Sequence, residues 1–267
     1  MRAASCARRG LPCSPPALCC RRRYLFIKLL PRYEDVAPRR RRVVLPRKAR
    51  GAPKISLVLD LDETLVHCSI EPIPDADLTF SVAFNGQDYQ VYVRKRPYLA
   101  HFLEEVSKLF EVTVFTASQS VYAETLLDLI DPKRRLVKYV LPAAAPPHVV
   151  LSSRLCCVRV CVCVCVCAVL CPRYRLFREA CLNVDGNYLK DLTVLGRDLK
   201  QTVLVDNSPH AFGYQVDNGI PIESWFDDPH DTELLKLLQF LKTLPGCKDV
   251  RPPVRRKFRV WDLINAA

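Results

Sequence analysis

The sequence lacks an uninterrupted apolar run of the about 18–20 residues that a helix needs to cross a bilayer. The nearest approach is residues 149–170, which Arg154 and Arg159 interrupt. Residues 24–30 form another apolar stretch, but it is short and contains Lys28. We therefore expect no membrane span.

The part of the chain beyond residue 50 also has almost no net charge. The whole chain has a formal net charge of +12. Its first 50 residues hold 15 Lys and Arg against two acids, Glu34 and Asp35, which gives +13 and leaves −1 for the other 217 residues. Because the globular part has no basic excess, we expect no direct nucleic-acid partner.

Cysteine is scarce in the parts of the chain that have the pattern of a folded domain. Of the 14 cysteines, four lie in the first 20 residues and seven lie between Cys156 and Cys171. Only Cys68, Cys181 and Cys247 remain for the rest of the chain. This distribution argues against a disulfide framework and fits a reducing compartment.

Residues 1–53 are rich in Arg, Pro, Ala and Cys and show no sustained hydrophobic period. We expect a basic, disordered leader over residues 1–53, or a leader that is not translated in the cell. The arginines at 39–42, which continue to Arg47 and Lys48, also fit a nuclear-import patch. An Arg-rich, acid-poor start is also typical of an organelle transit peptide. The predicted compartment is the nucleus, with the mitochondrion as the alternative.

Residues 140–173 break the pattern of the rest of the chain. Cys and Val alternate from Cys161 to Cys167, which fits an apolar strand, a soft-metal site, or a translated TG dinucleotide repeat. The last interpretation is favoured, because removing the segment joins Tyr139 to Arg175 in a natural strand sequence. We therefore interpret the segment as a low-complexity insertion with little apolar surface to offset the entropy of ordering it.

The remaining sequence alternates strand and helix patterns. We expect strands at residues 54–60, 111–116, 175–184, 202–205 and 220–225, and helices at 99–109, 121–130 and 231–244. A hairpin is expected at 78–84 and 89–93, because Asn85-Gly86 is a type I′ turn signal. The end of the chain, 251–267, is expected to be a basic tail docked by Phe258, Trp261, Leu263 and Ile264. This alternation favours an α/β fold with a mostly parallel sheet.

Two carboxylates one residue apart follow the first buried strand. Asp60 and Asp62, in the sequence DLDET, would repel each other by roughly 3–4 kcal/mol at a separation of about 4–5 Å and an effective dielectric constant near 20. A bound divalent cation, or a proton on one carboxyl group, relieves that repulsion. The pair therefore suggests a metal site at the carboxyl end of a central strand, where open α/β sheets bind their ligands.

Two more apolar strands end in polar residues, Thr116 with Ser118 and Asp206 with Asn207, and Lys190 precedes the last strand. Each group has a use in phosphoryl transfer. One aspartate can attack phosphorus, and a second can protonate the leaving alcohol and later activate water. A lysine and a hydroxyl can hold phosphate oxygens, and Mg²⁺ lets an anionic nucleophile approach an anionic phosphate.

With the motifs DLDETLVHC, FTAS, YLKDL, LGRDL, VDNSP and IPIESWF, the chain resembles the haloacid dehalogenase superfamily. Within it, the resemblance is to the small phosphatases that act on the C-terminal domain of RNA polymerase II. It covers about residues 54–139 and 175–258 and implies a Rossmann-like fold, with a central, mostly parallel sheet flanked by helices. It also implies one phosphatase domain over 54–258, interrupted by 140–173 and followed by a tail, 259–267.

The resemblance also implies a role for each site residue. Asp60 is expected to be the nucleophile and a metal ligand, and Asp62 the acid and base, with its backbone carbonyl on Mg²⁺. Asn207 is expected to bind Mg²⁺, with Asp206 positioning metal-bound water. The residues expected to hold the phosphate are Thr116 and Lys190. Family members carry a small β insertion at the approach to the lysine, and the lack of a large cap after the first strand leaves room for a protein substrate.

The predicted function is that of a Mg²⁺-dependent protein serine/threonine phosphatase working through an aspartyl-phosphate. Its expected partner is a phosphoprotein, such as the RNA polymerase II C-terminal domain, and the chain is expected to be a monomer. The alternative is a binding module of the same fold, such as a mitochondrial import translocase subunit. Other residues have simpler roles: His67, Cys68 and Trp225 are expected to pack inside, and Arg197 to contact substrate or form an internal ion pair.

Overall fold

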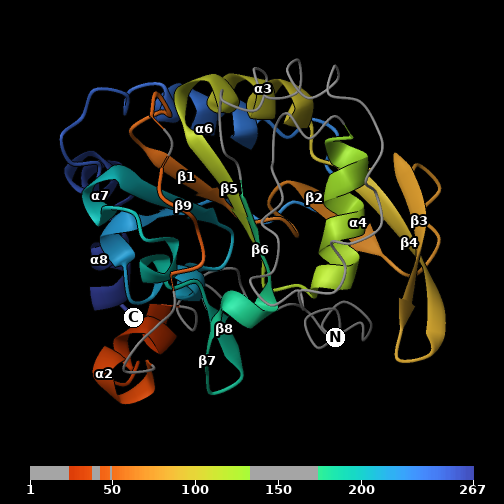
Figure 1. The fold of residues 1–267 in the computed structure, drawn as a ribbon, viewed down its shortest axis with the longest axis horizontal. Coiled ribbons are helices and arrows are strands. Elements are labelled where there is room, and N and C mark those ends of the chain that lie inside the picture. The colour runs from red at the N-terminus through yellow and green to blue at the C-terminus, as the bar shows by residue number, and fades with distance from the viewer. Residues whose placement is uncertain (1–23, 38–42, 49, 133–173) are drawn as a thin grey trace, which may run out of the picture.

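The computed structural model describes residues 24–37, 43–48, 50–132 and 174–267 (Figure 1). The insertion expected at 140–173 and the first 23 residues of the expected leader lie outside the described residues. Within the described part of the chain, no helix is both long and apolar enough to cross a bilayer.

A five-stranded parallel sheet forms the centre of the molecule, in the order β10-β9-β1-β5-β6. The strands are β1 (Ser56–Leu59), β5 (Glu111–Phe115), β6 (Tyr174–Leu176), β9 (Thr202–Asp206) and β10 (Gly219–Pro221). Every residue of β1, β5 and β9 is buried. Strands that are covered on both faces are continuous apolar runs in the sequence. This pattern led to the prediction of these three strands. The expected α/β fold with a mostly parallel sheet is confirmed.

Successive residues of each central strand pack on opposite faces of the sheet. On one face, Leu59 belongs to a large hydrophobic cluster with α3 (Leu99–Leu109), α4 (Ser120–Ile130) and α6 (Glu233–Leu241). The ends of these three helices lie within three residues of the expected boundaries. On the other face, Val58 belongs to a second cluster. The sheet therefore separates two hydrophobic cores. The two ends of its strands are left for polar groups.

The second face is covered largely by short elements. Four 3₁₀ turns contribute to it: η2 (Leu192–Leu195), η3 (Leu199–Gln201), η4 (Pro209–Phe212) and η5 (Val216–Asn218). The C-terminal helices are α7 (Arg251–Phe258) and α8 (Val260–Asn265). Ile264 is buried as expected, because a helix places residues four apart on one face. Trp261 and Leu263 are each 43% exposed, so neither is buried, but Trp261 contacts the domain at its surface, where its Nε1 donates to Asp217 at 2.8 Å.

Part of the expected leader also packs on this second face. Residues 24–28 are helical, and α2 covers Tyr33–Val36. The side chains of Tyr24, Ile27 and Leu45 are buried in the second cluster. The expectation of disorder is therefore wrong for these stretches, because apolar side chains one helical turn apart dock on the domain. We call residues 24–37 the N-terminal strap.

A separate antiparallel sheet follows β1, in the order β2-β4-β3. Its strands are β2 (Val66–Ser69), β3 (Leu78–Phe84) and β4 (Gln87–Lys95). The turn between β3 and β4 has positive φ at both Asn85 and Gly86, 52° and 75°, as the expected type I′ turn requires. This small β insertion projects beside α4 in Figure 1. Antiparallel β structure therefore lies at 66–95 as well as at the expected approach to the lysine, where residues 182–189 form a hairpin.

The strand expected at 175–184 is wrong as a single element. The chain instead forms β6, the 3₁₀ turn η1 (Arg178–Ala180) and the antiparallel hairpin of β7 (Leu182–Val184) and β8 (Asn187–Leu189). The turn is fixed from the end of β5: the Arg178 amide donates to the Ser118 carbonyl at 3.1 Å, and Arg178 Nε donates to the Ala117 carbonyl at 2.6 Å. The hairpin then delivers Lys190 to the edge of the sheet.

Candidate active site

The parallel register of β1 and β9 brings the first two carboxylates together. Leu59 lies opposite Val205, so the next residues, Asp60 and Asp206, emerge side by side. The Asp60 amide donates to the Val205 carbonyl at 2.9 Å and continues the ladder by one residue. The carboxyl ends of parallel strands thus meet at one edge, the place where open α/β sheets bind ligands.

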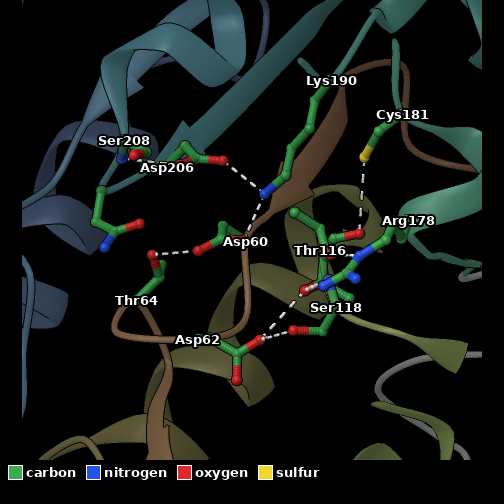
Figure 2. Close-up of polar contacts among 12 residues, drawn as sticks. Asp60, Asp62, Thr64, Thr116, Ser118, Arg178, Cys181, Lys190, Asp206 and Ser208 are labelled. Carbon is green, nitrogen blue, oxygen red and sulfur yellow. Dashed lines mark hydrogen bonds and ion pairs between the residues drawn. The ribbon is translucent and has the colours of Figure 1, made fainter. Parts of the chain in front are cut away.

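Lys190 lies between these two carboxylates, as Figure 2 shows. Its Nζ donates to Asp60 Oδ1 and, at 2.6 Å, to Asp206 Oδ2. The exposed fractions of Lys190, Asp60 and Asp206 are 2%, 6% and 1%. Burial alone would lower the pKa of Lys190, but the charges of Asp206 and Asp60 more than offset this and raise it. The ammonium form is therefore the form that the site holds.

The second oxygen of Asp60 is fixed by the loop that follows it. Thr64 Oγ1 donates to Asp60 Oδ2 at 2.8 Å, and Thr64 is fully buried. The loop turns through Glu63, which has a φ of 56°, and the Leu65 amide donates to the Leu61 carbonyl at 2.9 Å. The DLDET sequence therefore forms a tight turn that orients the Asp60 carboxylate from both oxygens.

Asp62 points away from Lys190, toward the end of β5 and the start of α4 (Figure 2). Its Oδ2 accepts from Ser118 Oγ at 2.7 Å and from Thr116 Oγ1 at 3.3 Å. Its Oδ1 accepts from Tyr122 OH at 2.5 Å. Burial raises the pKa of Asp62 to about 6, against the opposing effect of the Tyr122 and Ser118 hydroxyls. A carboxyl group with such a pKa exchanges its proton near neutral pH.

The expected site residues thus form two neighbouring clusters. The first joins Asp60, Lys190 and Asp206, and the second joins Asp62 and Thr116. Lys190 and Thr116, the two residues expected to hold phosphate, lie in different clusters. A phosphate that contacts both would therefore lie between Asp60 and Asp62.

Asn207 follows β9 and contacts a residue outside both clusters. Its Nδ2 donates to Ser224 Oγ at 3.0 Å. The neighbouring Asp206 Oδ1 accepts from the Ser208 amide at 2.8 Å. Burial, with the Asp60 charge, raises the pKa of Asp206 in spite of the Lys190 ammonium.

The donor set at this edge fits a divalent cation. Three carboxylates, on Asp60, Asp62 and Asp206, and one ammonium give a formal charge of −2 when all are ionised (three −1 and one +1). Among the described residues, no three His, Cys, Asp or Glu side chains form a metal-binding group. A cation here would thus need oxygens from the Asn207 amide or the backbone, and carboxylate, amide and carbonyl oxygens are the ligands that Mg²⁺ prefers.

Tyr122 is a site residue that the sequence did not reveal. It lies in the first turn of α4, where its apolar neighbours made it look like part of a core-facing helix stripe. The available signal was its position six residues after Thr116, at the start of a helix that follows a site strand. The burial of the site raises the pKa of Tyr122 well above its ordinary value, so the phenol remains a donor.

A mostly apolar pocket of about 530 Å³ opens beside Asp62. It lies between the β insertion and α4, and its lining includes Ile70, Val82, Phe84, Val91 and Val121. Arg178 closes one side, with its guanidinium 4.9 Å from the centre of the Tyr188 ring. The volume of the pocket is within the range of pockets that hold a small ligand, so it is large enough for several amino-acid side chains.

Two minor expectations can be placed. Trp225 is buried, 4% exposed, as expected. Arg197 lies at the opposite end of the sheet, where its Nε and Nη2 each donate to Glu111 at 2.8 Å. Of its two expected roles, the internal ion pair is the one observed, with Glu111 rather than the adjacent Asp198 as its partner.

Comparisons with known proteins place the chain in a family. Residues 55–145 and 153–251 match the model of the NLI interacting factor-like phosphatases. The chain is 50% identical over 244 residues to CTD small phosphatase-like protein 2 of Dictyostelium discoideum, covering 91% of this chain and 36% of that protein. It is 47% identical over 221 residues to CTD small phosphatase-like protein 3 of Caenorhabditis elegans, covering 82% and 65%.

A human relative is also similar. Carboxy-terminal domain RNA polymerase II polypeptide A small phosphatase 1 is 38% identical over 209 residues, covering 78% of this chain and 66% of that protein. The chain thus spans about a third to two thirds of the length of these relatives. With matches over most of its length, the chain belongs to the NLI interacting factor-like phosphatase family.

Proposed function

We propose that the chain is a Mg²⁺-dependent protein serine/threonine phosphatase that works through an aspartyl-phosphate on Asp60. The observation that carries the proposal is the different environment of Asp60 and Asp62, two aspartates with one residue between them. Asp60 is oriented by an ammonium and a hydroxyl, while Asp62 lies among hydroxyl donors with its pKa raised to about 6. Two carboxyl groups with such different environments suit a nucleophile and an acid/base.

In the first half-reaction, an Asp60 oxygen attacks the phosphorus of a phosphoserine or phosphothreonine. The new bond joins Asp60 to phosphorus, and the bond from phosphorus to the alcohol oxygen breaks. The protonated Asp62 carboxyl donates its proton to that oxygen, so a neutral alcohol leaves. Asp62 lines the apolar pocket, where the rest of a peptide substrate would lie, so it can donate its proton from that side of the site.

In the second half-reaction, the Asp62 carboxylate takes a proton from water as the water oxygen attacks phosphorus. The bond between Asp60 and phosphorus breaks, inorganic phosphate leaves, and both aspartates return to their starting states. Lys190 and Thr116 are the proposed donors to the phosphate oxygens, from the two sides of the site.

The residues that would hold Mg²⁺ are Asp60, Asn207 and the Asp62 backbone carbonyl, with Asp206 beside them. When bound, the cation supplies positive charge that reduces repulsion between the carboxylate and the phosphate. The family lies in a superfamily whose phosphatases typically use Mg²⁺, and the oxygen-rich, negatively charged edge supports the same choice here.

The proposed substrate is a phosphoprotein. The pocket beside Asp62 would hold an apolar side chain next to the phosphorylated residue, in a groove open enough for an extended peptide. The names of the relatives refer to the RNA polymerase II C-terminal domain, and we propose that domain, or another phosphoprotein, as the substrate. This choice favours the nucleus, which a tagged chain would distinguish from the mitochondrion by microscopy.

The proposal is tested with purified protein, an aryl phosphate, and Mg²⁺ added or chelated. Wild type is expected to hydrolyse the aryl phosphate only when Mg²⁺ is present. Asp60→Asn is expected to be inactive with and without Mg²⁺. Asp62→Asn provides the matched variant: it should form the phosphoenzyme from an aryl phosphate, which needs little help from an acid, and then hydrolyse it slowly.

Equal activity of wild type and Asp60→Asn would rule out Asp60 as the nucleophile. If neither protein is active but both bind a phosphopeptide or a mitochondrial presequence tightly, the chain is a binding module of the same fold.

A further inference from the structure

The N-terminal strap (residues 24–37) lies against the elements that bring two site residues to the sheet edge. In Figure 1 its helix α2 lies next to the β7–β8 hairpin, whose second strand ends at Leu189, one residue before Lys190. Strap residues Phe26, Leu30 and Val36 pack on the small cluster formed by Leu182, Val184 and Leu189 of that hairpin. Phe26 also meets His210 edge to face, with ring centroids 5.8 Å apart, next to the loop that carries Asn207.

One strap residue reaches the neighbour of the site lysine directly. Tyr33 OH donates to Asp191 Oδ2 at 2.7 Å and lies 3.2 Å from Thr193 Oγ1. Asp191 is 1% exposed and immediately follows Lys190. Neighbouring residues in an extended chain point to opposite sides, so Lys190 enters the site while Asp191 is held from behind.

Asp191 fixes the backbone at this point in several ways. Its Oδ1 accepts from the Thr193 amide at 2.9 Å, which caps η2, and from Gln215 Nε2 at 3.2 Å. The Lys190 amide itself donates to the Ala211 carbonyl at 2.7 Å. The position of the Lys190 backbone is therefore set by contacts outside the site, and Tyr33 supplies one of them from a segment about 160 residues earlier.

We propose that Tyr33 is a positioning residue that sets the reach of Lys190 through Asp191, so that the strap is part of the catalytic domain. The inference rests on the proposed function, in which Lys190 holds phosphate. A lysine has a long, flexible stem, and its donor geometry is only as well defined as the backbone that carries it. Loss of the Tyr33 hydroxyl would remove one of two donors to Asp191 Oδ2, leaving Thr193 Oγ1 at 2.8 Å, and would let the Lys190 backbone shift.

The test compares two single-atom changes on the strap interface. Tyr33→Phe removes the hydroxyl that contacts Asp191. Tyr214→Phe is the matched control, because Tyr214 OH donates to the Pro31 carbonyl of the strap at 3.0 Å and does not contact Asp191. Both changes keep the ring pair of Tyr33 and Tyr214, whose centroids are 5.3 Å apart.

The affinity for inorganic phosphate is measured by calorimetry with Mg²⁺ present, together with KM and kcat for an aryl phosphate and the melting temperature. We expect Tyr33→Phe to weaken phosphate binding and raise KM by about tenfold, the low end of the range seen when supporting partners of a site residue are lost. Tyr214→Phe should change neither by more than about twofold. In a Lys190→Met background, Tyr33→Phe should weaken phosphate binding no further.

Equal effects of the two tyrosine changes on phosphate binding, or no effect of Tyr33→Phe, would overturn the positioning role. A lower melting temperature for both variants with unchanged phosphate binding would show that the strap is structural only, and this too would overturn it. The binding readout also separates this inference from the proposed function. A wild type that binds phosphate in a Tyr33-dependent way but hydrolyses no ester would sustain the role of Tyr33 while refuting the phosphatase.

Discussion

Both ends of the central sheet bury a group of charges, and the two groups are built differently. At the amino ends of β1 and β5, Glu111 is fully buried and accepts from Ser56 at 2.6 Å and twice from Arg197 at 2.8 Å. Lys48 Nζ lies 3.2 Å from the same carboxylate. Both Glu111 oxygens have donors, and two cations surround one anion.

At the carboxyl ends the ratio is reversed. Asp60 and Asp206 share one ammonium, that of Lys190, and hydroxyl groups donate to the third carboxylate, Asp62. The Glu111 group holds one buried anion between two cations, which suits a structural role, whereas excess negative charge at a ligand-binding edge is available for a cation and a substrate. We infer that the Glu111 end, where cations outnumber the anion, is structural, and that the Asp60 end, where anions outnumber the cation, is functional. We call them the saturated end and the unsaturated end, for their charge.

The largest expected effect is on stability, at the saturated end. Glu111→Ala leaves the Arg197 guanidinium and the Ser56 hydroxyl buried without their partner, which should cost about 3–5 kcal/mol of unfolding free energy. Urea unfolding followed by circular dichroism measures the loss. Turnover per folded molecule should stay at the wild-type value, and a cost below about 1 kcal/mol would contradict the structural role of this end.

A second prediction makes the same substitution at each end. Lys190→Met removes the only ammonium donor of the site cluster and should lower kcat/KM for an aryl phosphate by about 10²–10³-fold, the usual loss of one electrostatic donor. Lys48→Met, at the other end, is the matched control and should leave kcat/KM unchanged. Similar losses of activity for both variants would show that the two ends are not functionally distinct.

The sequence predicted the site where local pattern and topology agree. Apolar runs ending in Asp60 and Asp206 identify two neighbouring parallel strands, and parallel strands place such ends together. The direction of the Asp62 side chain was beyond prediction, because it depends on where α4 begins relative to β5. Tyr122 therefore appeared to be an ordinary apolar position, although its hydroxyl contacts Asp62.

The predictions of the fold were wrong where composition or the length of a stretch guided them more than local pattern did. Arginine-rich sequence hid the spacing of Tyr24 and Ile27, which dock on the domain. The stretch 175–184 has the residues of a strand, yet only three residues pair with β5, and the Arg178 contacts then turn the chain. Of the antiparallel sheet at 66–95, only the hairpin was predicted, from the turn signal Asn85-Gly86.

A smaller effect is expected from the hydroxyls around Asp62. Tyr122→Phe removes the donor to Asp62 Oδ1 and should lower kcat for a phosphoserine peptide by about tenfold, the value of one hydrogen bond to a charged group. Tyr174→Phe at the saturated end is the control, since its ring lies beside Arg197 at 5.9 Å. Steady-state kinetics on both variants measures the difference, and an unchanged kcat in Tyr122→Phe would separate Tyr122 from the chemistry.

The smallest effect is a pH dependence that isolates the charge of Glu111. Burial alone would raise the pKa of Glu111, but Arg197, Ser56 and Lys48 together lower it. A carboxyl group with a lowered folded-state pKa stabilises the fold above its ordinary pKa of about 4.3, and this contribution is lost as the pH falls through the folded-state pKa. Glu111→Gln keeps the shape and one accepting oxygen, so it removes only the charge.

The unfolding free energies of wild type and Glu111→Gln should therefore differ most at about pH 6 and converge as the pH falls below about 4. Urea titrations across this range measure the difference, and the other carboxylates cancel because both proteins contain them. A difference that stays constant with pH would show that the Glu111 charge does not stabilise the fold, and the contrast between the two ends of the sheet would then rest on hydrogen-bond geometry alone.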